Sequence, residues 1–218
     1  HYMAVVLPDA PVITDLCGMV LEGGTNNDPE PVEGTDPIPL MVWMATQTGA
    51  CQAAVFQTMN QPIVFSDDPG ATEKSDNELI SWTWKSFMDS AAPRDPTLIV
   101  QYPMTKAAKK AMDVVAAYAP TKNPAYAIDK FTALGESRYG WTSYLIAAAD
   151  TRVIGFTPQA FSMLNMQANL LHQYQSLGGW SFPFAPYHTD GLPGRLDSPE
   201  ATELFSMQDP HTPALLAD

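Results

Sequence analysis

The chain has 218 residues, of which 45% are hydrophobic and 16% are charged, and its formal net charge is −13 at pH 7. This length and composition suit one compact globular domain, and the negative charge excludes nucleic acid and anionic lipid surfaces as favoured partners. No apolar run approaches the ~20 residues of a membrane span, and the N-terminal residues lack the charged start of a signal peptide. Because the chain opens at His1, directly on a predicted strand, we expect upstream sequence with any export signal to be absent.

The sequence predicts an α/β fold because short apolar runs alternate with longer segments of helical periodicity. Such alternation is typical of βαβ units, in which a mostly parallel sheet has helices on both faces. The expected strands are Ala4–Leu7, Thr14–Leu21, Ala50–Gln57, Lys130–Leu134 and Val153–Thr157. The expected helices are Leu40–Thr46, Asp76–Ser90, Lys106–Ala119, Arg138–Ala149 and Phe161–Tyr174. No internal repeat interrupts the pattern, so residues 1–218 are expected to form one domain, with 158–218 as a lid or cap.

The two cysteines, Cys17 and Cys51, are too few for a disulfide framework and match no metal-binding spacing. Two buried free thiols are the favoured interpretation, although the residues could pair if their strands are neighbours and their Cα atoms come within ~7 Å. No arrangement of histidine and cysteine forms a zinc site, and no phosphate-binding glycine motif is present. We therefore expect neither a metal nor a cofactor.

The segment around Ser137 has the pattern of a nucleophile elbow. It runs from the apolar strand at Phe131 through a glycine-flanked serine into an alanine-rich helix. In such an elbow a sharp turn between strand and helix presents the serine hydroxyl above the sheet edge. Ser137 is then the nucleophile. Backbone N–H groups of Arg138 and of the loop at Gly24 and Thr25 would bind the oxyanion.

The elbow pattern has an alternative. The second glycine of a common elbow stands two residues after the serine, whereas Tyr139 occupies that place here and Gly140 follows it. An ordinary strand–helix turn, with Ser137 as the N-cap of the helix, fits this pattern equally well.

Several unusual strings, spread over nearly the whole chain, are more specific than the serine turn alone. They are Gly23–Asn26, Asn60–Pro62, Pro103–Ala108, Ala111–Asp113, Gly135–Trp141, Leu164–Met166 and Trp180–Phe182. Together they resemble the PhoPQ-activated pathogenicity-related protein family, whose eukaryotic members include the autocrine proliferation repressor. The family turn usually reads Gly-Ala-Ser-Lys-Arg-Gly-Trp, so the displaced glycine is shared, while Glu136, Arg138 and Tyr139 differ.

The resemblance implies an α/β-hydrolase fold, a secreted or periplasmic location, and similarity to serine peptidases of the dipeptidyl-peptidase kind. In this fold the catalytic order is serine, then an acid, then histidine. Family members carry the acid after a segment resembling Asp209-Pro210, and this chain stops at Asp218. We therefore expect the domain to be truncated at its C-terminus, without its acid and base, and with a sheet edge left uncovered.

Residues within the chain are poor substitutes for the absent pair. His188 with Asp190, and Asp209 with His211, are each too close in sequence to be positioned by separate loops. His172 falls in a helical pattern, where a packed or capping role is favoured. Asp150 is explained by a turn.

The aromatic residues Trp180, Phe182 and Tyr187, with Phe184 beside them, either line a substrate pocket or form the packing of a cap. Two functions remain open. The first is a serine hydrolase of peptidase or esterase type that acts on a peptide or ester and is inactive as this fragment. The second is a secreted signalling or virulence-associated protein that uses the hydrolase scaffold to bind a protein partner.

Overall fold

The computed structural model describes residues 1–162 and 164–212. These form two compact units, the first made of His1–Asn60 and Met104–Phe161 and the second of Gln61–Pro103 and Ser162–Asp218. The segment expected to form a lid, 158–218, lies mostly in the second unit, which also takes in 61–103. Met163 of the expected helix Phe161–Tyr174 and residues 213–218 of the expected lid lie outside the described residues.

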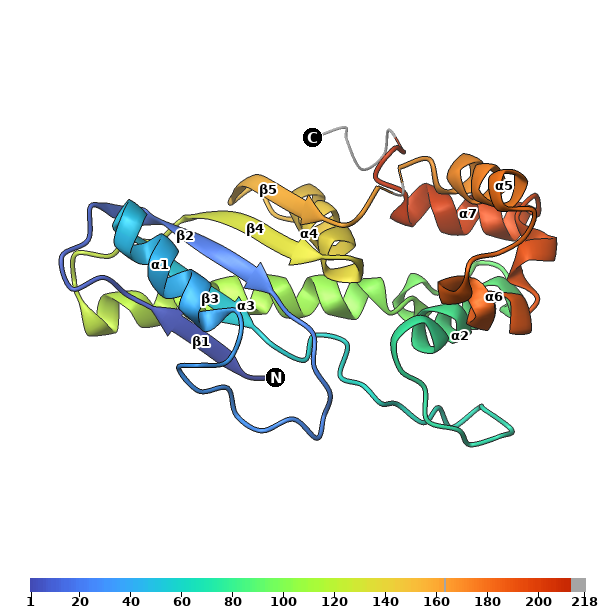
Figure 1. The fold of residues 1–218 in the computed structure, drawn as a ribbon, viewed down its shortest axis with the longest axis horizontal. Helices are drawn as coiled ribbons and strands as arrows, with labels where there is room; N and C mark the ends of the chain where they lie inside the picture. The colour runs from blue at the N-terminus through green and yellow to red at the C-terminus, as the bar shows by residue number, and fades with distance from the viewer. Residues whose placement is uncertain (163, 213–218) are drawn as a thin grey trace. The chain divides into compact units, whose positions relative to one another are not determined.

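The first unit contains a five-stranded sheet in the order β1-β3-β2-β4-β5 (Figure 1). Strand β1 is antiparallel to β3, and every other pair is parallel. The sequence-based prediction of a mostly parallel sheet is therefore confirmed, with all five strands in the expected places. They span Met3–Val6 (β1), Ile13–Leu21 (β2), Ala50–Val55 (β3), Lys130–Glu136 (β4) and Val153–Gln159 (β5).

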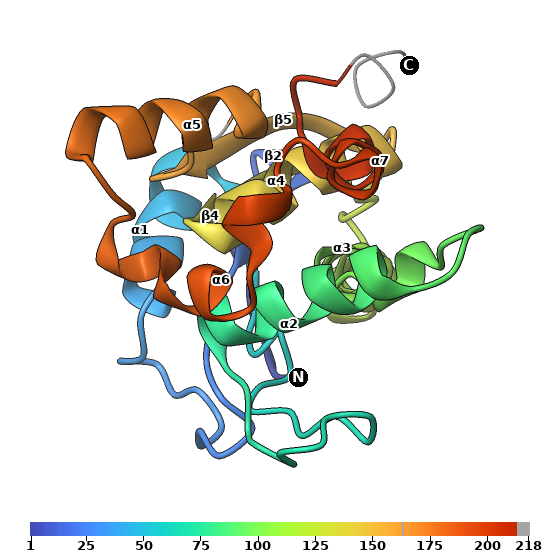
Figure 2. The same ribbon diagram turned by 90° about the vertical axis from the view of Figure 1, so that its right-hand side faces the viewer.

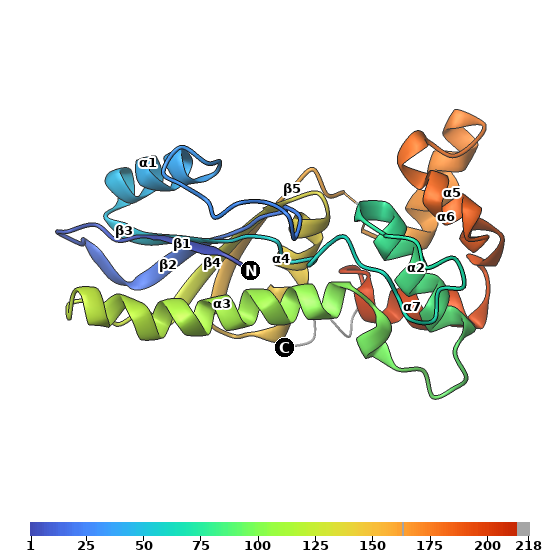
Figure 3. The same ribbon diagram turned by 90° about the horizontal axis from the view of Figure 1, so that it is seen from below.

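Helices cover both faces of this sheet. Helix α1 (Ile38–Thr48) packs on one face against Val20 and Phe56. Helices α3 (Gln101–Lys122) and α4 (Arg138–Ala149) share the other face, where Ile146 of α4 joins the main apolar core. Figure 3 shows α1 and α3 on opposite sides of the sheet.

Strand β5 lies at one edge of the described sheet and is only partly covered. Its side chains Ile154 and Phe156 are 60% and 42% exposed. Strand β3, by contrast, is buried along its whole length because it lies between two neighbours and beneath helices on both faces.

The second unit is helical (Figure 2). It contains α2 (Asp76–Asp89), α5 (Met166–Leu177), α6 (Ala185–Thr189) and α7 (Pro199–Gln208), with short 3-10 turns η1 (Pro96–Leu98), η2 (Phe182–Phe184) and η3 (Leu192–Arg195). The stretch Pro183–Pro199 is rich in prolines, which are typical of loops, yet it contains α6 and η3 and leads into α7. Pro199 stands in the first turn of α7, where its missing N–H costs nothing, and the Ser198 hydroxyl accepts the Ala201 N–H.

Helix α5 begins five residues later than the sequence predicts. The Phe161 ring stacks on Trp141 in the first unit, with centroids 5.4 Å apart. The helix itself starts after Asn165, whose N–H and that of Met166 donate to the carboxylate of Asp209 at 3.0 and 2.6 Å. None of the helices in the part of the chain described here is long and apolar enough to cross a bilayer.

Candidate active site

The strand order places a topological switch point at the carboxyl ends of β2 and β4. These two strands are neighbours, with Leu21 paired to Gly135. The helix that follows β2, α1, packs on one face of the sheet, and the helix that follows β4, α4, packs on the other. Open α/β sheets bind ligands at such a switch point, outside the carboxyl ends of the strands. The segment after β2 begins with Glu22, and the residue after β4 is Ser137.

Ser137 occupies a strained turn between β4 and α4. Its φ and ψ are 56° and −121°, a conformation that non-glycine residues adopt only when the surrounding structure enforces it. The Ser137 N–H donates to the Gln159 carbonyl of β5 at 2.8 Å, and the Ser137 carbonyl accepts the Trp141 N–H at 3.0 Å. The side chain is exposed and makes no capping hydrogen bond. Ser137 is therefore not an ordinary N-cap, which has extended backbone and a bonded side chain.

Two glycines allow the close backbone contacts within this turn. A Cβ on Gly135 would lie 2.4 Å from the carbonyl oxygen of Tyr139, and a Cβ on Gly140 would lie 2.9 Å from that of Gln159. Glycine is thus required at 140, and position 139 accepts a large side chain. The displaced second glycine of the sequence pattern is compatible with a tight elbow.

The loop after β2 lies against the elbow helix. A Cβ on Gly23 would lie 2.9 Å from the Tyr139 hydroxyl oxygen, so this ring packs on the glycine. The Gly23 carbonyl accepts the N–H of Gln57 at 2.7 Å. Gly24 has φ of 113°, which favours glycine, and its N–H makes no hydrogen bond to any described residue. The loop therefore offers a backbone donor near the start of α4.

The other expected donors differ in availability. The Thr25 N–H donates to the carboxylate of Asp28 at 2.6 Å, and its hydroxyl donates to the same group at 2.8 Å. These bonds lower the pKa of Asp28. Arg138 is the first residue of α4, and its guanidinium lies 3.9 Å from the Met59 sulfur. The Gly24 N–H is thus better placed than the Thr25 N–H to donate to a ligand.

Carboxylates that the sequence analysis did not single out surround the loop. Burial is the main cause that raises the pKa of Glu22, and the negative charges of Glu136 and Asp36 raise it further. A cavity of about 360 Å³ beside Gly23 and Gly24 also has the side chains of Glu22, Asp28, Glu30 and Asp36 in its wall. This surface disfavours anionic groups. The acidic residues on either side of Gly23-Gly24 were the one sequence signal of this negative surface. Their gathering around one cavity depends on the fold.

Histidines are sparse around Ser137. In the first unit as described, His1 is the sole histidine, and its Nδ1 lies 2.8 Å from the Gln57 carbonyl oxygen. No described residue of this unit forms a hydrogen bond to the Ser137 hydroxyl. The structure therefore shows a strained serine turn beside a glycine loop, and within the described part of the first unit no base is hydrogen-bonded to the serine.

Apart from Asp150, the other candidate acids and bases lie in the second unit, where several of them make local hydrogen bonds. In the second unit His188 is exposed on α6, and Asp190 accepts a hydrogen bond from Ser81. His172 is exposed on α5, with Nε2 3.4 Å from the Ser176 hydroxyl. The buried Asp209 carboxylate binds the first N–H groups of α5 and also the N–H of His211 at 2.9 Å.

Asp150, in the first unit, is buried and forms an ion pair with the partly exposed Arg152. Its two carboxylate oxygens contact Arg152 at 2.9 and 2.8 Å. Hydrogen bonds from Arg152 are the main cause that lowers its pKa to about 2. The turn predicted from sequence at Asp150 is thus also stabilised by an ion pair with Arg152.

The aromatic residues that were predicted either to line a substrate pocket or to pack a cap lie in different surroundings. Trp180, Phe184 and Tyr187 surround a wholly apolar cavity in the second unit, whereas Phe182 is 91% exposed. The cavity is about 20 Å³, which is close to the size of one water molecule. These rings therefore act as core packing of the second unit.

The fold and site define an α/β protein with a strained serine turn beside a glycine loop at the switch point of a mixed sheet. The family model for "PhoPQ-activated pathogenicity-related protein" matches residues 1–213, so the chain belongs to this family. It is 30% identical over 210 residues to "Autocrine proliferation repressor protein A" of Dictyostelium discoideum, covering 96% of this chain and 41% of the relative. The chain thus spans less than half of that relative. No solved structure matches it.

Proposed function

We propose that this chain carries the nucleophile half of a serine hydrolase of peptidase or esterase type, on an α/β-hydrolase-like sheet. The observation that supports this proposal most is the backbone of Ser137, with φ of 56° and ψ of −121° at the turn between β4 and α4. A residue that only ends a strand does not need this strain, because capping is achieved with extended backbone. Strain of this kind is characteristic of a nucleophile elbow.

In the proposed reaction the Ser137 oxygen attacks a substrate carbonyl carbon while a base takes the hydroxyl proton. The carbonyl oxygen becomes an oxyanion, which the N–H groups of Gly24 and Arg138 stabilise. The positive end of the α4 dipole adds to this effect. The leaving alcohol or amine then departs with a proton, and water hydrolyses the acyl-enzyme.

The charge around the loop favours neutral or cationic substrates. Glu22, Glu136 and Asp36 are close enough for their charges to interact, so an anionic group beside Gly24 would be repelled. A peptide or a neutral ester fits this environment better than a phosphorylated or carboxylated acyl group. We also propose that the protein acts outside the cytoplasm, as the family resemblance implies.

A fluorophosphonate probe tests the proposal. The 218-residue chain is expected to label negligibly, since the Ser137 hydroxyl has no bonded base among the described residues of its unit. Losing triad members removes several orders of magnitude in rate, so a form extended to the length of the relative is expected to label far faster. Ser137→Ala should abolish that labelling.

Ser176→Ala is the matched control, because Ser176 is an exposed serine 3.4 Å from a histidine on a regular helix. Its loss should leave labelling unchanged. A folded extended protein that stays unlabelled would contradict the hydrolase proposal. Strong labelling of the 218-residue chain would instead show that a base is already present, and His188 would be the first histidine to replace.

A second proposal is supported by the name of the relative, a proliferation repressor. In it the same scaffold binds a protein partner and performs no hydrolysis. An extended protein whose repressor activity persists in Ser137→Ala would favour binding. Loss of both labelling and repression in that variant, with the fold intact, would favour catalysis.

A further inference from the structure

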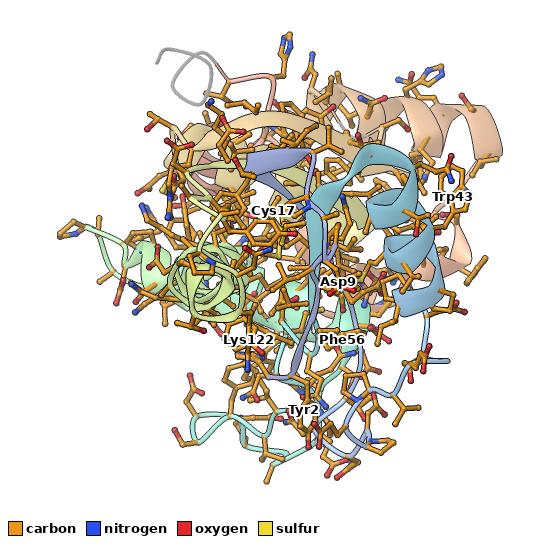
Figure 4. The ribbon with its side chains drawn as sticks, turned by 90° about the vertical axis from the view of Figure 1, so that its left-hand side faces the viewer. Tyr2, Asp9, Cys17, Trp43, Phe56 and Lys122 are labelled. Carbon is orange, nitrogen blue, oxygen red and sulfur yellow. The ribbon has the colours of Figure 1, made fainter. Side chains whose placement is uncertain are left out.

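Cys17 and Cys51 face each other in the centre of the sheet. Cys17 of β2 is the direct partner of Cys51 of β3. Both side chains are 0% exposed, and their Sγ atoms lie 2.8 Å apart. Figure 4 labels Cys17 on its strand. Paired residues on adjacent strands have Cα atoms about 4.8 Å apart, which is within the range that a disulfide requires.

The spacing of the sulfurs favours a disulfide over a metal site. Two thiolates on a tetrahedral zinc ion, with bonds of about 2.3 Å, stand roughly 3.8 Å apart. The sulfurs here are closer than that and need to move by less than about 1 Å to reach disulfide length. Within residues 1–162 and 164–212, no group of three or more potential ligands surrounds a metal position.

The surroundings are those of a structural cross-link. Met19, Phe131, Val115 and Tyr126 belong to the same buried apolar cluster as both cysteines. Burial is also the main cause that raises the pKa of the Cys17 thiol. Redox-catalytic cysteines are partly exposed and have a lowered pKa. This pair therefore fits a permanent bond rather than a reactive dithiol.

We propose that Cys17 and Cys51 form an intramolecular disulfide when the protein folds in an oxidising compartment. The thiolate of one cysteine attacks a small-molecule or protein disulfide, forms a mixed disulfide and releases one thiol. The thiolate of the other cysteine then attacks the sulfur of the first, forms the S–S bond and releases the second thiol. The cysteines lose two electrons to the external disulfide, and their two protons are balanced by those on the released thiols.

The bond forms before the core closes, because both sulfurs are inaccessible in the folded protein. It links residues 34 positions apart, and the closed loop contains Gly24 and α1. Two backbone hydrogen bonds join the segments at the carboxyl ends of the two linked strands. The Glu22 N–H donates to the Val55 carbonyl at 2.9 Å, and the Gln57 N–H donates to the Gly23 carbonyl at 2.7 Å. The cross-link thus stabilises the base of the donor loop.

Refolding in glutathione buffer tests this inference. The 218-residue chain is unfolded, refolded with reduced and oxidised glutathione, and digested without reduction. A peptide containing Cys17 linked to one containing Cys51 is expected, lighter by two hydrogen masses, with no thiol available for alkylation after denaturation. The oxidised protein should melt about 10 °C above the reduced protein.

A Cys17→Ala/Cys51→Ala variant controls for other redox effects and should melt at the same temperature in both buffers. Folded wild-type protein whose two cysteines are both alkylated on denaturation would overturn the proposal. Cross-links found only between molecules would overturn it as well. The peptide map of the wild-type protein decides the question even if the double variant fails to fold.

Discussion

The candidate site of the first unit depends on close backbone approaches, whereas the aromatic centre of the second unit depends on side-chain packing. A Cβ on Gly135 or Gly140 would lie 2.4 or 2.9 Å from a carbonyl oxygen, whereas nothing lies within 4 Å of that position at Gly194. In the second unit Trp84 contacts the rings of Tyr187 and Phe205, with centroids 5.4 and 5.8 Å apart. Backbone geometry therefore determines the candidate site, whereas packing of the second unit depends on a few large rings.

The largest effect is expected from Trp84→Ala in the second unit. Trp84 is 6% exposed, and its indole N–H donates to Gln208 at 3.2 Å. Removing the ring should cost about 3–5 kcal/mol in the free energy of unfolding, because a cavity remains. Urea denaturation measures this cost. Trp84→Phe retains a ring and should lose clearly less; equal losses would mean that ring packing is not what holds the unit.

Gly135→Ala should lower the free energy of unfolding by about 3 kcal/mol, because the new methyl group would clash with backbone atoms that cannot move aside as a side chain can. Urea denaturation measures this loss. Gly194→Ala is the matched control in the second unit and should change stability by at most ~0.5 kcal/mol. Amide hydrogen exchange should place the loss of protection in β4 and α4. Similar costs for both variants would contradict a special requirement for close backbone contact at Gly135.

Asp150→Asn should cost about 1–2 kcal/mol at neutral pH. The folded pKa of Asp150 is lowered to about 2 from an ordinary 3.8, so its contribution is present above pH 3.8 and is lost as the pH falls toward 2. The wild-type and variant stabilities should therefore converge in acid. In the second unit, Glu203 forms an ion pair with Arg94, and the Glu203 side chain is 42% exposed. Glu203→Gln removes this ion pair and should lower the free energy of unfolding by less than ~1 kcal/mol.

The smallest effect has the opposite sign. Burial and the nearby carboxylates raise the pKa of Glu22, so the folded protein favours its protonated form. That preference supports stability at low pH and is lost as the pH rises through the folded pKa. Glu22→Gln should therefore raise the melting temperature by about 1–2 °C at pH 7 and have little effect below pH ~4. Glu30 is exposed, so Glu30→Gln should leave the melting temperature unchanged at both pH values. A lower melting temperature for Glu22→Gln at pH 7 would instead show that the Glu22 carboxylate has a structural role.

The first unit was the more predictable of the two. Its strands were read from apolar runs, and helix α4 begins and ends at the residues expected from sequence, Arg138 and Ala149. Helix α7 could have been recognised from Ser198 and Pro199, which are start signals of a helix, although prolines are also typical of loops. The start of α5 could not, because it depends on the carboxylate of Asp209, 44 residues beyond Asn165.

The alternation of strands and helices and the position of Ser137 in a turn could be predicted from sequence, since these follow from local periodicity and from glycine. Tertiary structure was needed to place the Gly24 loop beside the Ser137 turn, to half-bury Glu22 near other carboxylates, and to bring Cys17 into register with Cys51. These features depend on strand order and register. Both are set by which apolar surfaces pack together across the whole unit, and such long-range packing leaves no local mark in the sequence.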